Sequence, residues 1–161
     1  MKKILVVLMA FLFLNGCDSG TMTEKEDLFQ YKDSYVGDNG AVGNITRELP
    51  MPNGEQMNGL ELKTTDEPYG IIINYEEADI SEYEVTNYNE LALYNASIIL
   101  SLVKNADWVQ FNFLEKEMTV TREELENWYG KDLRDFASED ELSAFIQEYL
   151  QDEEQVNAFF E

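Results

Sequence analysis

The sequence contains no histidine and a single cysteine, Cys17. Without histidine, a chain cannot build a Ser-His-Asp or Cys-His catalytic set, and it cannot bind zinc through imidazole. A serine nucleophile would need lysine as its base, and we expect no such pair here. One cysteine also excludes a framework of internal disulfides. These absences remove the commonest hydrolase and zinc-site chemistries from consideration.

Basic residues and long apolar runs are also scarce. The 161 residues include 33 acidic residues against 11 basic ones, so the formal net charge is −22. A field of this sign repels phosphate backbones, so we expect no nucleic-acid partner. The longest N-terminal apolar run, residues 4–14, would rise about 16 Å as a helix, which is too short to span a bilayer permanently.

This apolar run follows a short basic segment (residues 1–3), as in a secretory signal peptide. It ends in Leu14-Asn15-Gly16-Cys17, which resembles the lipobox of bacterial lipoproteins, although that family usually has a small residue where Asn15 stands. The resemblance implies cleavage between Gly16 and Cys17, and acylation of Cys17 by fatty acids such as palmitate. The alternative is an uncleaved signal anchor in which the cysteine is incidental.

The lipoprotein resemblance divides the chain into three parts. Residues 1–16 are the signal peptide, residues 17–26 a lipidated tether, and residues 27–161 a single globular domain. Two acyl chains anchor a protein stably, so we expect it on the extracytoplasmic face of the cell membrane, held through Cys17. Cleavage removes two lysines and leaves 33 acidic residues against 9 basic ones, a formal charge of −24.

The composition predicts a folded domain of the α+β class. Hydrophobic residues make up 44% of the chain and aromatic residues 12%, which is too much apolar side chain for intrinsic disorder. We expect a small antiparallel sheet of about four strands in two hairpins, packed against a buried helix, with helices at the N-terminal and C-terminal ends. Four segments alternate between apolar and polar residues and are predicted strands: residues 60–64, 71–75, 108–114 and 118–120.

Three kinds of signal predict the helices. Residues 89–103 are apolar on nearly every side, which predicts the buried helix, whereas the glycines and prolines of residues 51–59 predict a loop. Two capping-box patterns, beginning at Thr121 and at Ser138, predict helices near the C-terminus, and a terminal turn at residues 156–160 could continue the second. An N-terminal helix is predicted between its cap and a terminating proline, with apolar residues on one face: Asp38, Val42, Ile45, Leu49 and Pro50.

Two motifs carry a further resemblance. The first is Tyr-Val-Gly-Asp-Asn at residues 35–39, with Asn-Ile at 44–45 and Leu-Pro at 49–50; the second is Glu-Pro-Tyr-Gly at 67–70, with Ile-Asn-Tyr at 73–75. Together they resemble the domain-of-unknown-function family 4825 of Gram-positive bacteria over most of the mature chain. The resemblance implies an extracytoplasmic domain, often on lipoproteins and sometimes attached to membrane sensor peptidases. It implies no activity, because none is assigned to the family.

Candidate catalytic and metal-binding groups are few. Acidic pairs such as Glu76-Glu77 are abundant, but a chain with 33 acids yields pairs by chance, and we interpret them as solvated surface. Asp33, Asp38 and Asn39 could offer oxygen ligands to calcium, yet no EF-hand pattern is present, so turn and cap roles are favoured. We therefore predict no catalytic residue, no metal site and no cofactor.

Seven tyrosines could line a carbohydrate or peptide groove, although core and rim positions are the more ordinary interpretation: Tyr31, Tyr35, Tyr69, Tyr75, Tyr83, Tyr88 and Tyr94. Two hypotheses follow. The first is a lipid-anchored module that binds or senses an envelope protein or a wall ligand. The second is a hydrolase that acts on cell-envelope polymer with carboxylates alone. It needs a cleft with two converging carboxylates, roughly 5 to 10 Å apart, of which at least one has a raised pKa.

Overall fold

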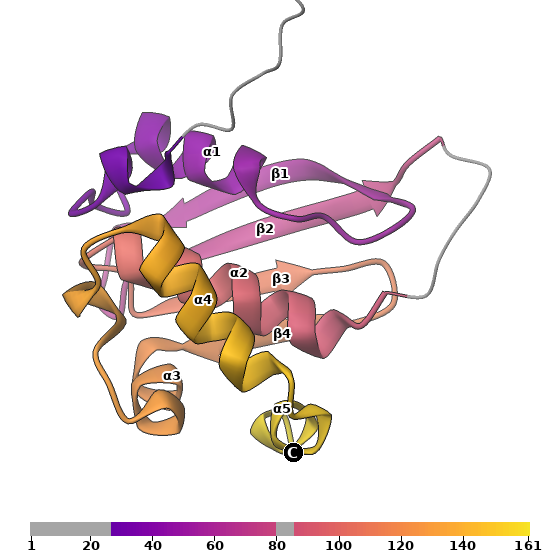
Figure 1. Ribbon diagram of the computed structural model, residues 1–161. Helices are drawn as coiled ribbons and strands as arrows, with labels where there is room; N and C mark the ends of the chain where they lie inside the picture. Colours follow the sequence, from indigo (N-terminus) through magenta and orange to yellow (C-terminus); the bar gives the residue numbers. More distant parts are fainter. Residues whose placement is uncertain (1–26, 80–85) are drawn as a thin grey trace, which may run out of the picture.

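The computed structural model describes residues 27–79 and 86–161 (Figure 1). The predicted signal peptide, the tether and Cys17 lie outside the described residues. Within the described part the fold is α+β, as predicted, with an open four-stranded sheet and helices at both ends of the domain. None of the helices in these two ranges is long and apolar enough to cross a membrane.

The sheet consists of β1 (Glu55–Lys63), β2 (Gly70–Glu77), β3 (Trp108–Asn112) and β4 (Glu117–Thr121), which are neighbours in that order. The two predicted hairpins, β1–β2 and β3–β4, are present and antiparallel. β2 and β3, however, pair in parallel, so the sheet is mixed and not antiparallel throughout. The long connection between them carries a helix, and such a crossover returns the chain to the end of the sheet where β2 began.

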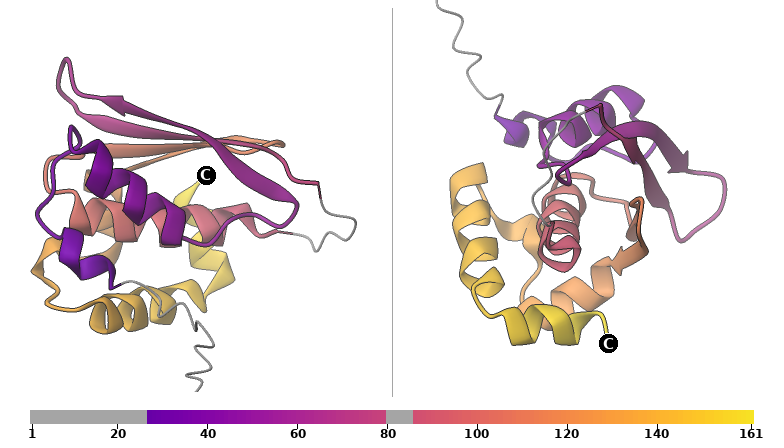
Figure 2. Two further views of the ribbon diagram at one scale, coloured as in Figure 1. Left: turned by 90° about the horizontal axis from the view of Figure 1, so that it is seen from above. Right: turned by 90° about the vertical axis from the view of Figure 1, so that its right-hand side faces the viewer.

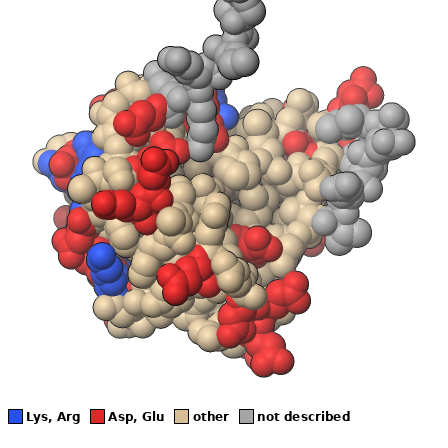
Figure 3. Space-filling model, in the orientation of Figure 1, with Lys and Arg blue, Asp and Glu red and all other residues tan. Residues whose placement is uncertain are grey.

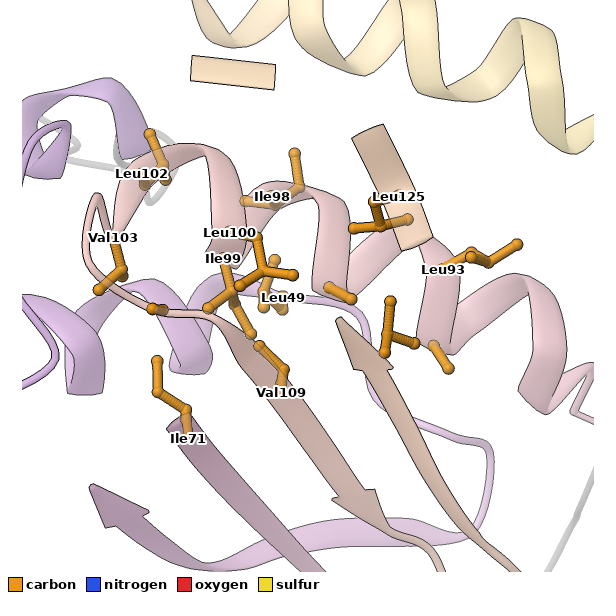
Figure 4. Packing of buried hydrophobic residues seen from close by; sticks show 14 of the residues in the cluster. Leu49, Ile71, Leu93, Ile98, Ile99, Leu100, Leu102, Val103, Val109 and Leu125 are labelled. Carbon is orange, nitrogen blue, oxygen red and sulfur yellow. The ribbon is translucent and has the colours of Figure 1, made fainter. Parts of the chain in front are cut away.

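That crossover contains α2 (Tyr88–Leu102), the buried helix predicted from the sequence. Residues 95–102 of this helix are all buried. Ile71 and Val109 reach from the sheet toward one side of α2, whereas Ile98 and Leu102 point to the opposite side (Figure 4). The helix lies between two layers, which explains why its sequence has almost no polar face.

The second layer over α2 is built by the C-terminal helices (Figure 2), which are α3 (Arg122–Tyr129), the 3-10 helix η2 (Leu133–Asp135), α4 (Glu139–Leu150) and α5 (Glu153–Phe159). Two N-terminal elements, η1 (Leu28–Tyr31) and α1 (Asn39–Glu48), pack on the same side of the sheet as α2. The opposite face of the sheet has no described helix over it. The resulting order of layers is sheet, α2 with α1, and C-terminal helices.

Aromatic side chains give the C-terminal layer a core of its own. Seven rings form a chain of neighbouring pairs with centroids 4.7 to 5.6 Å apart: Trp128, Tyr129, Phe136, Phe145, Tyr149, Phe159 and Phe160. All of these pairs are tilted or edge-to-face, which is the favourable arrangement of aromatic quadrupoles. This layer therefore coheres through its own contacts as well as through α2.

Side-chain caps start the C-terminal helices where the sequence predicted. Thr121 Oγ1 accepts a hydrogen bond from the N–H of Glu124, and the Glu124 carboxylate accepts one from the N–H of Thr121, so this capping box is complete. The second box is half formed. Ser138 accepts from the N–H of Glu141, but the Glu141 side chain makes no return bond within the described residues.

Two segments differ clearly from the prediction, whereas other element ends shift by one or two residues. Residues 51–59 were expected to form a loop, yet β1 begins at Glu55 and passes through a bulge in its first half. Asparagine and glycine favour turns in isolation, and here the pairing with β2 overrides that preference. The terminal turn does not continue α4: the Asp152 carboxylate accepts from the N–H of Gln155 and starts the separate helix α5.

Asp38 caps α1, as predicted, because its Oδ1 accepts a hydrogen bond from the N–H of Ala41 at 3.0 Å. Gly40 and Gly43 lie inside α1, and each weakens a helix by roughly 1 kcal/mol relative to alanine, so the cap matters more than usual. We expect Asp38→Ala to lower the free energy of unfolding by about 1 kcal/mol, and Asp38→Asn to lower it clearly less. Urea melts of the two variants measure this, and equal midpoints for both variants and the parent would contradict the cap.

Candidate functional site

A cleft of about 720 Å³ opens between α2, α4 and the segment that joins α1 to β1. This volume falls within the range of roughly 300 to 1,000 Å³ that is typical of ligand sites. In Figure 1, α4 stands in front of α2, and these two helices, with their cap residues, contribute most of the lining residues. Its lining consists of Pro50, Met51, Asn53, Thr86, Asn87, Glu90, Leu91, Tyr94, Gln147, Leu150 and Gln151.

Helical periodicity brings the lining side chains of each helix onto one face. They recur every three or four positions, at residues 87, 90, 91 and 94 of the α2 segment and at residues 147, 150 and 151 of the α4 segment. A contact of 3.5 Å between the hydroxyl groups of Tyr94 and Ser143 joins the two helices beside the cleft. A bond of 2.8 Å from Asn89 Nδ2 to Asn157 Oδ1 joins α2 to α5, the helix that follows α4.

Asn95 of α2 holds the third wall of the cleft, residues 50–53, in place through a hydrogen bond. Its Nδ2 donates to the carbonyl oxygen of Pro50 at 2.9 Å. Asn95 is fully buried, and its Oδ1 has no hydrogen-bond partner among the described residues. An orphaned buried acceptor costs roughly 1 to 3 kcal/mol. α2 therefore gives up stability at this position while it holds the wall in place.

Several polar groups of the lining are available to a ligand. The side-chain amides of Asn53, Gln147 and Gln151 make no hydrogen bond to another described residue. Glu90 Oε2 accepts a long bond of 3.5 Å from Asn87 Nδ2, and Oε1 accepts none from the described residues. These groups stand among apolar side chains, an arrangement that suits recognition of a ligand with both apolar and hydrogen-bonding parts.

None of the acidic pairs among the described residues lines the cleft. Residues 76–77 end β2, residues 123–124 form the first turn of α3, and residues 152–154 start α5. Three described carboxyl groups have a pKa that departs from its ordinary value, and hydrogen bonds lower it in each case: Lys63 to Glu61, Arg134 to Asp132, and the Gln155 N–H to Asp152. A general acid needs the opposite shift.

Glu55 is a buried carboxylate that sequence reasoning missed. It is 5% exposed, and it lies at the start of β1, inside the segment predicted as a loop. Oε1 accepts a hydrogen bond from the Tyr88 hydroxyl at 2.5 Å, and Oε2 accepts one from the N–H of Leu114 at 3.2 Å. Glu55 thus ties β1, α2 and the β3–β4 turn together, and it does not line the cleft.

The residues considered for calcium have structural roles. Asp38 is engaged as the cap of α1, and Asn39 is the first residue of that helix. Asp33 lies in a turn with a φ of 64°, a left-handed conformation that aspartate adopts more readily than most residues. Across residues 27–79 and 86–161, no three His, Cys, Asp or Glu side chains are placed to share a metal ion.

The described tyrosines do not share one site. Tyr94 is the one that lines the cleft among those the structure describes, and Tyr83 lies outside the described residues. Tyr75 and Tyr88 pack against Phe113, with ring centroids 5.1 and 4.8 Å apart. The tyrosines that the structure describes are therefore not joined in one aromatic groove.

One serine has a lysine three residues later, the spacing of a Ser-x-x-Lys motif, which sequence reasoning overlooked. Ser101 is 3% exposed, and its Oγ donates to the carbonyl oxygen of Ile98 at 2.8 Å. Lys104 Nζ lies 4.0 Å from the ring centroid of Tyr35. The hydroxyl and the ammonium are engaged separately, so the pair is not arranged as nucleophile and base.

The fold and the cleft define an α+β domain in which C-terminal helices form one wall of a ligand-sized site. The chain belongs to the family described as Domain of unknown function (DUF4825), which it matches over residues 28–124. This match confirms the family resemblance carried by the two sequence motifs. It ends in the first turn of α3, so the α4 wall of the cleft lies beyond the matched residues. Comparisons with curated proteins and with solved structures give no match.

The buried phenols predict a loss of stability at alkaline pH. Burial raises the pKa of Tyr75 to about 12, and the charge of Glu55 adds to the shift. Burial is also the main cause that raises the pKa of Tyr88 and of Tyr129. The folded state keeps these protons where the unfolded chain, with phenol pKa near 10, loses them. The stability they contribute is complete below about pH 10 and is lost as the pH rises toward about 12.

Urea melts across this alkaline range measure the loss. We expect Tyr75→Phe to make the decline in unfolding free energy shallower, because phenylalanine has no proton to lose. Tyr35→Phe is the matched control, since Tyr35 is 54% exposed. The same decline in the parent and in Tyr75→Phe would show that Tyr75 does not carry the effect.

Proposed function

We propose that the protein is a lipid-anchored module of the extracytoplasmic face of a bacterial cell membrane, and that it binds or senses its ligand in the cleft between α2 and α4. The observation that carries this proposal is the set of uncommitted polar groups in a cleft of about 720 Å³ with partly apolar walls. Met51, one of the lining residues, is 48% exposed, although it is a large apolar side chain. Exposed methionine is frequent at adaptable binding surfaces.

The content of the cleft supports binding over hydrolysis of an envelope polymer. Glu90 is the one acidic residue among the described lining residues. A glycosidase that works with carboxylates alone needs two such groups, roughly 5 to 10 Å apart on either side of the bond that breaks. The same lining offers several amides and hydroxyl groups, which orient a ligand but do not supply a proton at neutral pH.

The anchor is supported by the sequence alone. A basic start, an apolar run over residues 4–14 and a terminal Cys17 form the pattern of a lipoprotein signal. Ten residues of tether (17–26) extend at most about 35 Å, so the ligand lies near the membrane. Acidic side chains outnumber basic ones on the face drawn in Figure 3, and their field holds the domain away from anionic lipid.

Replacement of the acylated residue tests the anchor. Cys17→Ser removes the sulfur that would carry the acyl group, so we expect it to abolish incorporation of labelled fatty acid and to block lipoprotein-type cleavage between Gly16 and Cys17. Asn15→Ala is the control, because it places a small residue at the position where the lipobox usually has one. Undiminished labelling of the Cys17→Ser protein would dispose of the lipoprotein interpretation.

Site-directed photocrosslinking in living cells tests the cleft. We expect a benzoylphenylalanine side chain in place of Gln147, which lines the cleft, to crosslink to a defined envelope component. Glu148 is the matched control, because it is the next residue of α4, is also exposed and does not line the cleft. Identical products from both positions would contradict the proposal that the ligand occupies this cleft.

A further inference from the structure

We infer that the ligand of this cleft is a short polypeptide segment that carries a primary amine, and that its ammonium group lies beside Glu90. The inference rests on the proposed function of the cleft and specifies the chemical class of its ligand. Three properties of the lining lead to it: the pattern of hydrogen-bonding groups, the nature of the apolar side chains, and the sign of the charge.

The hydrogen-bonding groups match a peptide backbone. Asn53, Gln147 and Gln151 each present an amide with N–H donors and a carbonyl acceptor, and no described residue uses them. They come from two opposite walls, the segment before β1 and the last turns of α4. A peptide backbone between these walls could donate its N–H groups to the amide oxygens and accept from the amide N–H groups through its carbonyl oxygens. A ligand with only donors or only acceptors would use half of these groups.

The apolar part of the lining favours a polypeptide over a glycan. It is formed by Met51, Leu91 and Leu150, with the edge of Pro50, and it includes a single aromatic residue, Tyr94. Aliphatic and thioether groups bury aliphatic side chains well, and this burial contributes roughly 25 cal/mol per Å². A glycan presents hydroxyl groups and would leave most of this surface unused.

The charge of the lining selects a cation. Glu90 Oε1 is uncommitted, and no lysine or arginine occurs among the described lining residues. The full chain adds a field of the same sign, with a formal charge of −22. A carboxylate ligand would meet repulsion from both sources, whereas an ammonium group gains a charge-assisted hydrogen bond and faster association.

The walls are positioned before any ligand arrives. The bond from Asn95 to Pro50 holds the segment before β1, and the Tyr94–Ser143 contact holds α4 against α2. Asn53 is fixed through its backbone, because its N–H donates to Thr86 Oγ1 at 2.8 Å. Preorganised walls reduce the ordering cost of binding, so a short segment with few contacts suffices.

Fluorescence anisotropy with the mature acylated protein, which begins at Cys17, in detergent micelles tests the inference. The probes are three labelled pools of short random peptides, each blocked at both ends, with one position fixed as lysine, N-acetyl-lysine or glutamate. Chitotetraose as a competitor of the bound lysine pool is the saccharide arm. We expect the lysine pool to bind most tightly, about fivefold better than the acetyl-lysine pool, as for an ion pair at an exposed site. The glutamate pool should bind most weakly.

Two variants locate the amine. Glu90→Gln should reduce the preference for lysine over acetyl-lysine to within about twofold and leave the affinity for the acetyl-lysine pool unchanged. Glu148→Gln is the matched control outside the lining, and it should keep the full preference. A circular dichroism spectrum equal to the parent's confirms that Glu90→Gln is folded.

The outcomes separate this inference from the proposed function. A lysine preference that Glu90→Gln abolishes and Glu148→Gln preserves supports the inference. Equal binding of the lysine and acetyl-lysine pools, no binding of any peptide pool, or displacement by chitotetraose overturns it. Each of these overturning results leaves the cleft as a binding site if the Gln147 crosslink forms. Loss of that position-specific crosslink instead removes the proposed function itself.

Discussion

The structure depends on the burial of α2 on both of its faces. The sheet covers one side and the C-terminal helices cover the other, so the polar groups of this helix must find partners inside the protein. Ser97 shows how this is achieved: its Oγ donates to the carbonyl oxygen of Leu93, and it lies 3.0 Å from the Tyr129 hydroxyl. Asn95 Nδ2 donates to the carbonyl oxygen of Pro50, but Asn95 Oδ1 has no hydrogen-bond partner among the described residues. The helix is thus a buried hydrophobic element whose few polar side chains form hydrogen bonds inside the protein.

The cleft forms where that burial ends. Residues 95–102 of α2 are covered on every side, whereas residues 87, 90, 91 and 94 remain partly accessible and line the cleft. The last turns of α4 and the segment before β1 supply the remaining walls. The site therefore combines residues of the family domain with residues that follow it in the chain. No single sequence motif contains the residues that line the cleft.

The buried Glu55 and the partly buried Arg122 stabilise the fold and are not arranged as catalytic groups. Glu55 accepts hydrogen bonds at both oxygens, and its charge adds to the burial that raises the pKa of Tyr75 and of Tyr88. Arg122 is likewise committed: it donates to the carbonyl oxygens of Val103 and Ala106, which follow the end of α2. Such charges link secondary-structure elements. Removing one partner lowers the free energy of unfolding by more than the interaction itself contributes, because the other group is left buried and uncompensated. The acidic groups outside these links are a solvated surface that sets the sign of the field.

The sequence by itself determined the elements whose cause is local. Hydrophobic periodicity located both hairpins and α2, and side-chain chemistry located the caps at Asp38, Thr121 and Ser138, because these signals act within one or two turns of chain. Only the tertiary structure decided the parallel pairing of β2 with β3, the strand at Glu55 and the separate helix α5. It alone produced the cleft, since Asn53, Glu90 and Gln147 are far apart in the chain and carry no pattern that links them. Their proximity follows from α4 packing over a helix already buried against the sheet, which is a long-range event that no local signal encodes.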